Sequence, residues 1–556
     1  MPSKRVLIIG GVAGGASCAT RLRRLDEQAE IFIFERGPDV SFANCGLPYY
    51  VGGVIQERHK LLMVKPERFR DWFKIEVRIR HAVKQIDRAA RTIEVENLQT
   101  RATSVERYDH LVLATGASPI RPELPGIDLP GIFTMRNLED VDAINAWILH
   151  RKAARAVVVG GGFLGLEMAE NLSRRGLEVT LVEMRDQIMP PMDAEMVAPA
   201  QEELRGQGVE LALGQTVAGF ETAPEERITV VTQEGPRHTG GVVILAMGVR
   251  PDAQLARSAG LEIGSLGGVR VDDRMRSSDP AVFAVGDAVE VGDFVTGQLV
   301  VAPLAGPANR QGRIAADVIA GRDARYRGTQ GTSVVGVFDL TLAMTGATEK
   351  TLRRYNIPFE KSYTHSLHHA GYFPGGEMIA LKLLFSPEDG RILGAQAVGK
   401  AGVEKRIDVL SLAIQKRATV YDLEEAELCY APQYGSAKDP INMAGFVAAN
   451  LLRGDVEVAH WSEWQARRAA GPELPLVLDV RTPGEFAAGA VPGAVNIPLG
   501  ELRTRLNELS RDGEIWVHCG VGQRAYYAVR ILKQHGFRAR NLSGGMRTYK
   551  EMAKRE

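Results

Sequence analysis

Four cysteines are the most reactive side chains of this 556-residue chain: Cys18, Cys45, Cys429 and Cys519. They are too few for a disulfide scaffold, and none lies in a CxxC pair of the kind that binds zinc. Cys45 lies in SFANCGLPYY, among small residues and just before a proline that can open a helix. Such a cysteine can be an inert core thiol, half of a disulfide, or a nucleophile whose thiolate is stabilised, and whose pKa is lowered, by a helix N-terminus.

The overall composition argues against several classes of partner. The chain has 68 lysines and arginines against 68 aspartates and glutamates, so its formal net charge is zero and no polyanionic partner such as nucleic acid is expected. No apolar stretch is long enough to span a bilayer. We therefore expect a soluble, cytoplasmic protein of three or four domains that binds neither nucleic acid nor membrane.

The elements that could position Cys45 begin with a glycine-rich turn. The segment RVLIIGGVAGGASCATRLRRL predicts a strand, a tight turn and a helix, with Gly10 and Gly15 at the first and third glycine positions and Val12 at the second. The next predicted strand, EIFIFER, ends in Glu35 about twenty residues later, where a carboxylate can accept the hydroxyls of a ribose. This spacing predicts a dinucleotide site.

The pattern then recurs. RAVVVGGGFLGLEMAENL supplies Gly160, Gly162 and Gly165 in full GxGxxG form, and EVTLVEM ends in Glu183. Each copy is followed by an apolar strand that closes on a small-residue turn, HLVLATGASP and GVVILAMGVRP. The repeat predicts two Rossmann-like domains. Beyond them, DPAVFAVGDAVEV places Asp287 at a Gly-Asp turn, as an acceptor for a flexible polyol or as a helix cap.

ATG, the second glycine motif and AVGDA, in this order, resemble the FAD-dependent pyridine nucleotide-disulfide oxidoreductases. The resemblance implies FAD on the first unit, with Glu35 at its ribose and Asp287 at its ribitol, and NAD(P)H on the second unit, inserted between two halves of the FAD domain. Glu183 favours NADH because a carboxylate repels a 2′-phosphate, whereas Arg185 leaves the use of NADPH open. The residues expected at the two cofactors are Gly10, Gly15, Glu35, Arg36, Ala114, Thr115, Gly116, Gly160, Gly162, Gly165, Glu183, Gly248, Gly286, Asp287, Pro303, Leu304 and Ala305.

The same resemblance decides among the three alternatives given above for Cys45. Most of these enzymes carry a CxxxxC pair, but Tyr50 stands at the second position here, so no dithiol can form at this place. SFANCGLPYY and RLRRLDE resemble the single-cysteine coenzyme A-disulfide and persulfide reductases, which implies that Cys45 is the nucleophile and that Ser17, Ser41 and Asn44 contact coenzyme A. Arg21 and Arg24 lie one helical turn apart and could bind its phosphates, or form an ordinary solvated basic face. Cys18 is expected to be a packing residue.

The sequence pattern changes near residue 327, and the segment beyond this position resembles the dimerisation domain of the family. HHAGYFPGG contains His368 and Tyr372, and CYAPQYGSAKDPIN contains Tyr430 and Lys438. The resemblance implies that both tyrosines reach the redox cysteine of the partner subunit, where a phenol can protonate a leaving thiolate. Tyrosines buried with satisfied hydroxyls are the alternative. His368 and Lys438 are expected at the substrate, and no family role is expected for Cys429.

The last hundred residues resemble a rhodanese, in PLVLDVRTPGEFAAGAVPGAVNIPLGEL, EIWVHCGVGQRAYYAVRIL and NLSGGMRTY. Cys519 follows a predicted strand and opens the loop CGVGQR, whose backbone N–H groups can point inward around a thiolate or persulfide. Arg524 adds a positive field at the start of the next helix. Rhodaneses often have histidine where Ala490 stands, which hardly affects the loop. A purely structural domain is the alternative.

These features predict an α/β fold: two Rossmann-like domains, an α+β dimerisation domain and a C-terminal α/β rhodanese domain. The expected boundaries are 1–150 and 254–326 for FAD, 151–253 for NAD(P)H, 327–452 for dimerisation, 453–458 as linker and 459–556 for the rhodanese. We expect a homodimeric reductase of coenzyme A persulfide, polysulfide or coenzyme A disulfide, without a metal. The alternatives are an NADH peroxidase or oxidase that uses a sulfenic acid at Cys45, and a non-catalytic flavin-linked sulfur sensor.

Overall fold

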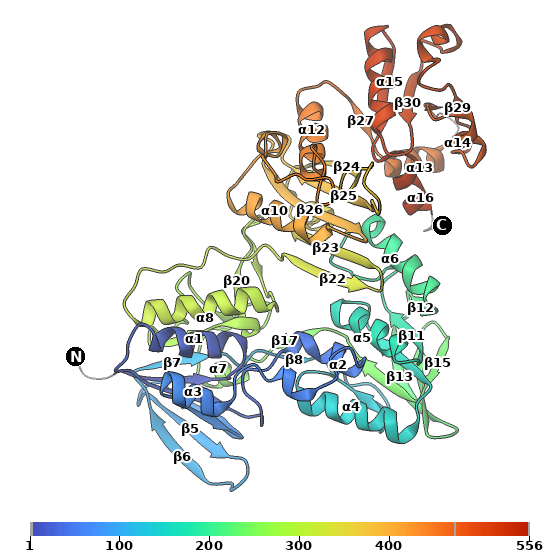
Figure 1. Cartoon of the computed structure of the whole chain (residues 1–556). Coiled ribbons are helices and arrows are strands. Elements are labelled where there is room, and N and C mark those ends of the chain that lie inside the picture. Colours follow the sequence, from blue (N-terminus) through green and yellow to red (C-terminus); the bar gives the residue numbers. More distant parts are fainter. Residues whose placement is uncertain (1–3, 472–473, 554–556) are drawn as a thin grey trace. The chain divides into compact units, whose positions relative to one another are not determined.

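The computed structural model describes residues 4–471 and 474–553 (Figure 1). The chain forms two compact units, the first made of Met1–Ile188 with Gln207–Gly331 and the second of Met189–Gly206 with Thr332–Glu556. Within the described residues, no helix combines the length and the apolar character needed to cross a membrane.

The first sheet of unit 1 is a parallel sheet covered by helices. Its strand β1 has the sequence RVLII and is almost entirely buried, as expected for a central parallel strand with both faces covered. Helices α1 (Ala13–Arg23) and α8 (Ala305–Ile319) lie side by side (Figure 1), so closely that a Cβ on Gly312 would stand 2.2 Å from the carbonyl oxygen of Gly14. The strand order is β19 (Val282–Ala284), β7 (His110–Leu113), β1 (Arg5–Ile9), β2 (Glu30–Glu35) and β3 (Ile75–Ile79).

The second parallel sheet of unit 1 repeats this construction. Its central strand β10 pairs with β11 and β16, and helix α5 (Phe163–Arg174) follows β10. The strand order is β12 (Glu210–Leu213), β11 (Glu178–Glu183), β10 (Arg155–Val159), β16 (Val242–Leu245) and β9 (Ile132–Phe133). Two antiparallel sheets extend the unit: β4 (His81–Asp87), β5 (Thr92–Asn97) and β6 (Thr103–Arg107); and β13 (Val217–Ala223), β14 (Arg227–Thr232) and β15 (Arg237–Gly240).

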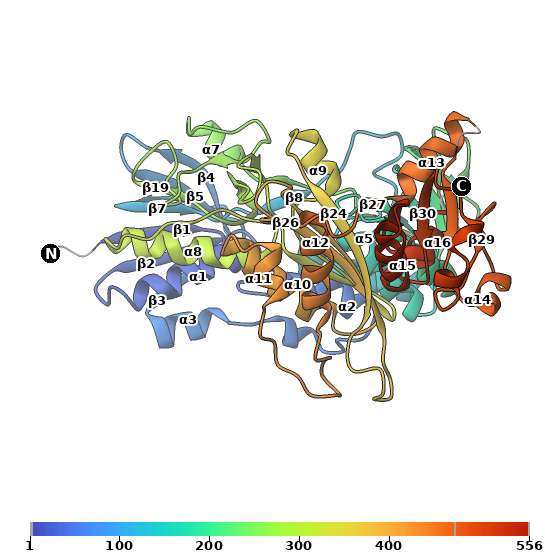
Figure 2. The same cartoon turned by 90° about the horizontal axis from the view of Figure 1, so that it is seen from above.

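Unit 2 contains an antiparallel sheet with helices α10 (Val403–Gln415) and α12 (Pro440–Leu452) packed on it (Figure 2). Helix α6 (Ala194–Gly206), from a segment between the strands of the second parallel sheet, also packs here. The strand order is β22 (Ser333–Val337), β23 (Leu340–Gly346), β26 (Ile392–Gly399), β25 (Met378–Phe385) and β24 (Glu360–Leu367). Strand β24 is therefore at the edge.

The C-terminal part of unit 2 is a small parallel sheet flanked by helices. Its strand order is β27 (Val458–Ala459), β31 (Arg538–Leu542), β30 (Glu514–His518), β28 (Leu476–Asp479) and β29 (Val495–Asn496). The helices around it are α13 (Trp461–Ala470), α14 (Pro483–Ala487), α15 (Gln523–Gln534) and α16 (Gly545–Ala553). The predicted fold class is confirmed in all its parts, whereas the predicted domain boundaries stay predictions.

Candidate functional site

The first glycine turn has the close backbone contacts of a dinucleotide site. A Cβ on Gly15 would stand 1.9 Å from the carbonyl oxygen of Gly10, and a Cβ on Gly10, whose φ is +99°, would stand 2.2 Å from that of Ala114. The Glu35 carboxylate accepts hydrogen bonds from the backbone N–H of Gly11 and of Gly37, each at 2.9 Å. The turn can therefore admit a pyrophosphate beside a carboxylate for the ribose, as FAD requires.

A cluster of charges adjoins this turn. Arg136 donates to the carbonyl of Thr115 at 3.0 Å and pairs with Asp252, and Arg36 pairs with the same carboxylate at 3.1 Å. Burial, together with the Arg36 cation, lowers the pKa of Arg136. Sequence patterns gave no sign of Arg136, which belongs to no motif. Burial raises the pKa of Asp287, and Arg136 opposes this shift.

Asp287 lies in a 3-10 turn, Gly286–Ala288, where Gly286 has a φ of +80° and donates its N–H to Gln311 at 2.7 Å. Asp287 thus lies in a Gly-Asp turn shortly after the buried strand β19, as the sequence predicted. Pro303, Leu304 and Ala305 form the partly exposed start of helix α8, in which Leu304 is the N-cap. Gly116, after Thr115, also has a positive φ of +72°.

The second glycine turn has the same geometry. A Cβ on Gly165 would stand 1.8 Å from the carbonyl oxygen of Gly160, whereas a Cβ on Gly162 would meet no atom within 4 Å, which leaves space for a ligand. The Glu183 carboxylate accepts the N–H of Gly161 at 2.7 Å and that of Arg185 at 2.8 Å. Gly248, at the end of the following strand, has a φ of +94°. These residues fit a nicotinamide dinucleotide.

Cys45 is exposed and lies in a 3-10 turn, Asn44–Gly46, followed by helix α2 (Leu47–Val51). The expected lowering of its pKa is wrong for the chain itself. Partial burial, and after it the charge of Glu167, raise the pKa of the Cys45 thiol, while a backbone hydrogen bond opposes them. The reason is that burial of the thiol and, after it, the nearby carboxylates outweigh the dipole of α2, which is weak because the helix has only five residues.

Glu167 is a residue near Cys45 that the sequence patterns did not reveal. It lies on helix α5, and the Tyr49 hydroxyl donates to its Oε1 at 3.4 Å. Burial raises the pKa of Glu167 to about 7, and burial together with Glu167 raises that of Tyr49 to about 12. The available signal was a carboxylate two residues after Gly165, on the helix that the glycine motif opens. The nucleotide helix α5 thus brings a group that titrates near neutral pH to Cys45.

The predicted coenzyme A contacts have different surroundings. Arg21 pairs with Asp317 at 2.7 Å, and both side chains are mostly buried, so its charge is partly balanced within the chain and its role at a phosphate stays a prediction. Arg24 is exposed and is the C-cap residue of the same helix. The Ser17 hydroxyl donates to Asn309. Ser41 has a φ of +50° and donates its N–H to the carbonyl of Gly11 at 2.9 Å, which ties the Cys45 segment to the first glycine turn.

Three further predicted positions can be placed. Asn44 is exposed beside Cys45. Cys18 is buried, and burial raises its pKa to about 12, consistent with packing. Cys429 is exposed.

Unit 2 brings the two predicted tyrosines together. The hydroxyls of Tyr372 and Tyr430 are 2.6 Å apart, and the residues are 75% and 47% exposed. These exposures argue against the alternative of buried tyrosines. His368 accepts the N–H of Glu377 at 2.9 Å through its Nδ1, and Lys438 is exposed beside the buried Asp439.

Cys519 is buried at the end of β30, and its Sγ accepts the N–H of Gly522 at 3.2 Å. The structure therefore contains one backbone N–H of the predicted kind, which points from the loop to the Cys519 sulfur. Arg524 is held by Glu485 through two hydrogen bonds of 2.6 and 2.7 Å, which lower the pKa of Glu485 to about 2 and raise that of Arg524. Glu485 lies in the quoted stretch RTPGEFAAG, but its role could not be read from that pattern; it balances much of the positive field expected from Arg524.

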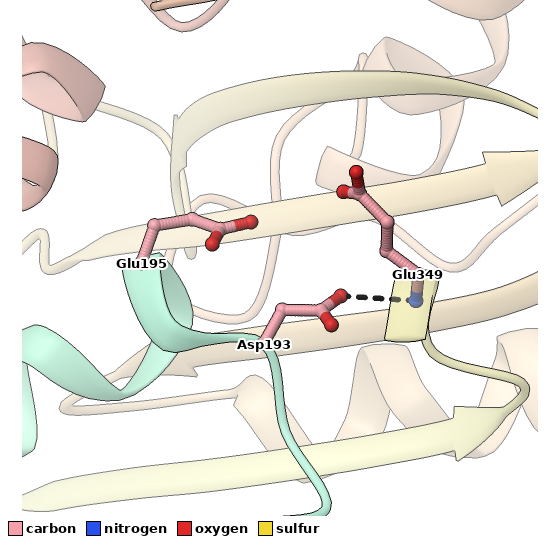
Figure 3. Close-up of side chains that lie close together, drawn as sticks. All are labelled: Asp193, Glu195 and Glu349. Carbon is pink, nitrogen blue, oxygen red and sulfur yellow. Dashed lines mark hydrogen bonds between the residues drawn. The ribbon is translucent and has the colours of Figure 1, made fainter. Parts of the chain in front are cut away.

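Three acidic residues gather at a different place in unit 2: Asp193, Glu195 and Glu349 (Figure 3). The buried ammonium of Lys382 lies at 2.8, 2.6 and 2.8 Å from their carboxylates. The Lys382 ammonium therefore occupies the position between the three carboxylates where a metal ion would bind. The cluster is therefore a buried ion-pair network that joins α6 to the antiparallel sheet.

Comparison with known proteins matches the whole architecture. Residues 4–312 match the pyridine nucleotide-disulphide oxidoreductase model, residues 332–439 its dimerisation domain and residues 462–552 the rhodanese-like domain. A coenzyme A disulfide reductase of Staphylococcus epidermidis is 37% identical over 448 residues, covering 80% of this chain and 99% of the relative. The chain belongs to the pyridine nucleotide-disulphide oxidoreductase family, with a rhodanese-like domain at its C-terminal end.

Solved structures extend the match to the rhodanese-like domain. Reduced Bacillus anthracis CoADR-RHD is 46% identical with a TM-score of 0.97, covering 100% of this chain and 99% of that one. A NAD-dependent persulfide reductase from A. fulgidus is 36% identical with a TM-score of 0.91, covering 98% and 100%. The water-forming NADH oxidase of Lactobacillus brevis is 30% identical with a TM-score of 0.78, covering 82% and 100%.

Proposed function

We propose that this protein is an FAD-dependent NAD(P)H-linked reductase of coenzyme A persulfide, polysulfide or coenzyme A disulfide, with a rhodanese domain that handles sulfane sulfur. One observation supports it above the others. The exposed Cys45 is tied through Ser41 to the first glycine turn, and a second cysteine, Cys519, lies in a backbone N–H loop of the same chain. The relatives named above include both a disulfide and a persulfide reductase.

The chemistry follows from the two sulfur atoms. Bound FAD supplies the two electrons of NADH to sulfur. The Cys45 thiolate attacks the sulfane sulfur of a persulfide, the sulfur–sulfur bond breaks, and the former carrier leaves as a thiol. The sulfur now on Cys45 is released as sulfide when two electrons arrive, which restores the thiolate. Glu167, protonated on about half of the molecules near its pKa of about 7, can supply the proton.

Cys519 supplies or receives sulfane sulfur, with coenzyme A as a suitable carrier. Its loop holds a sulfur atom through the Gly522 N–H, and no group that supplies electrons belongs to that loop. The loop therefore suits transfer of sulfur without a change of oxidation state.

A substrate panel tests the function. NADH consumption and sulfide release are measured with coenzyme A disulfide, coenzyme A persulfide, inorganic polysulfide, glutathione persulfide and oxygen. We expect at least one sulfur substrate to exceed oxygen a hundredfold in kcat/KM. The oxidase alternative predicts the reverse order, and the sensor alternative predicts no turnover with any substrate.

We further propose that the protein is a cytoplasmic homodimer in which Tyr430, paired with Tyr372, serves Cys45 of the other subunit. The exposure of both tyrosines supports this, since an exposed hydroxyl pair is free to meet a partner. Mixing inactive Cys45→Ser protein with inactive Tyr430→Phe protein restores one complete site per exchanged dimer. If subunits exchange and no activity returns, the shared site is wrong.

A further inference from the structure

The rhodanese-like part of unit 2 contacts the edge strand β24 of the antiparallel sheet through buried polar groups. The backbone N–H of Tyr363 donates to the Ser543 hydroxyl at 3.2 Å, and the His365 Nε2 lies 2.9 Å from the Thr548 hydroxyl oxygen, with both pairs buried. An edge strand has unpaired backbone groups that a neighbouring segment can cover. Tyr363 and His365 are two residues apart on the strand, so their side chains point to the same face of β24.

Between Ser543 and Thr548 the chain makes a glycine turn. Gly544 and Gly545 have φ values of +73° and +59°. A Cβ on Gly544 would stand 2.0 Å from the Thr548 hydroxyl oxygen and 3.0 Å from the Cβ of Tyr363. The turn is therefore packed against β24 with no space for a side chain.

The other side of the turn supports the cysteine loop. A Cβ on Gly545 would stand 2.5 Å from the Cys519 carbonyl oxygen. The first residues of α16 donate backbone N–H groups to this loop, Met546 to Cys519 at 2.7 Å and Arg547 to Gly520 at 3.0 Å. The position of α16 thus fixes the base of the loop that places the Gly522 N–H on Sγ.

We infer that strand β24 is a structural support for the rhodanese cysteine loop, and that His365 is a positioning residue for sulfur transfer at Cys519, acting through Thr548 and helix α16. The inference rests on the proposed sulfur-transfer role of Cys519. It makes the rhodanese-like part dependent on the antiparallel sheet for its full reactivity. Without the His365–Thr548 bond, α16 can shift, and the loop loses its alignment on the sulfur atom.

The charge state of His365 allows a matched pair of variants. Burial and the nearby Arg547 cation lower the pKa of His365 to about 3, so the ring is neutral at working pH. His365→Gln retains a neutral polar atom near the Nε2 position, whereas the shorter His365→Asn cannot reach Thr548. The second pair is Thr548→Ser, which retains the hydroxyl, and Thr548→Val, which removes it and keeps the shape.

The experiment measures two reactions of Cys519 in the full-length protein. The first is sulfur transfer from thiosulfate to cyanide: Cys519 takes the outer sulfur as sulfite leaves, and cyanide then removes it as thiocyanate. The second is the rate at which iodoacetamide alkylates Cys519, followed by peptide mass spectrometry, which reports on the loop even if thiosulfate is a poor donor. NADH-linked reduction of a small substrate is the control.

We expect His365→Asn and Thr548→Val to change both Cys519 rates by about five- to tenfold, and to leave the NADH-linked reaction within twofold. His365→Gln and Thr548→Ser should stay within twofold of the wild type in every assay. The inference is overturned if the members of each pair behave alike, or if the Cys519 rates are unchanged while only thermal stability falls. Thiosulfate activity that persists in Cys519→Ser would instead refute the proposed role of Cys519.

Discussion

Cys45 and Cys519 present two opposite environments for a sulfur nucleophile. Cys45 is on a short turn at the surface, and partial burial of the thiol, with the carboxylates Glu167 and Asp287, raises its pKa. Cys519 is buried, its sulfur accepts the Gly522 N–H, and the charge of Arg524 is balanced by Glu485. We interpret the difference as a division of labour, in which the exposed Cys45 would meet substrate and redox cofactor and the buried Cys519 would hold a sulfur atom.

The largest expected effect concerns the buried ion-pair network of Lys382 in unit 2, the unit that contains Cys519. Lys382→Met leaves Asp193, Glu195 and Glu349 without their shared cation, so we expect a loss of about 3–5 kcal/mol in the stability of unit 2. Hydrogen exchange should show lost protection in β24, β25 and α6, with the β1 sheet of unit 1 unchanged.

The matched control is Lys361→Met, because Lys361 pairs with Glu349, which Lys382 still compensates. We expect Lys361→Met to lose clearly less hydrogen-exchange protection than Lys382→Met. Equal losses in the two variants would contradict the role given to Lys382.

The second effect should be confined to the NADH-linked reaction, which we assign to Cys45. Glu183→Gln removes the charge at the second glycine turn while keeping an acceptor for the Gly161 N–H, so the preference for NADH over NADPH should fall about tenfold in kcat/KM. Sulfur transfer at Cys519 should not change. Glu178→Gln, an exposed position on the same strand, is the control. A wild-type protein that prefers NADPH would refute this assignment.

The third effect is smaller and depends on pH. Glu167 ionises as the pH rises through about 7, and its negative charge then disfavours the Cys45 thiolate. In the apoprotein, Glu167→Gln should therefore accelerate alkylation of Cys45 about three- to fivefold at pH 8, with little change at pH 6, where Glu167 is mostly neutral. A difference of the same size at both pH values would show that Glu167 acts through packing. Glu170→Gln, which changes another carboxylate on helix α5, is the control variant for Glu167→Gln in this alkylation assay.

Local sequence patterns predicted the fold and the cofactor turns because each depends on few residues. Gly15 and Gly165 follow from spacing alone, since any side chain there would meet a carbonyl oxygen. Cys45 was found from the residues around it and from their resemblance to the single-cysteine reductases, and Cys519 from the strand before it and the loop CGVGQR that it opens. Patterns of this kind carry information over a few residues only.

The features that the sequence did not reveal depend on contacts between distant segments. Arg136 reaches Asp252, Glu167 reaches Tyr49, and Glu485 reaches Arg524 across 116, 118 and 39 positions, and no local pattern shows which residue each of them will meet. The pKa of Cys45 was predicted to be lowered and is raised, and the cause of this wrong prediction is the same. A predicted helix start is local, whereas the burial of the thiol and the charge of Glu167, which together outweigh it, come from segments that are distant in the sequence.

The most direct test of this division of labour compares Cys45→Ser with Cys519→Ser. NADH consumption, sulfide release and thiosulfate-to-cyanide transfer are measured for both, with coenzyme A persulfide and inorganic polysulfide as reductase substrates. We expect Cys45→Ser to lose all NADH-linked sulfur reduction while sulfur transfer persists, and Cys519→Ser to lose sulfur transfer while small substrates are still reduced. If Cys519→Ser, with normal FAD content and folding, stops the reduction of every substrate, the two sites act in obligatory series and Cys45 is not a self-sufficient reductive centre.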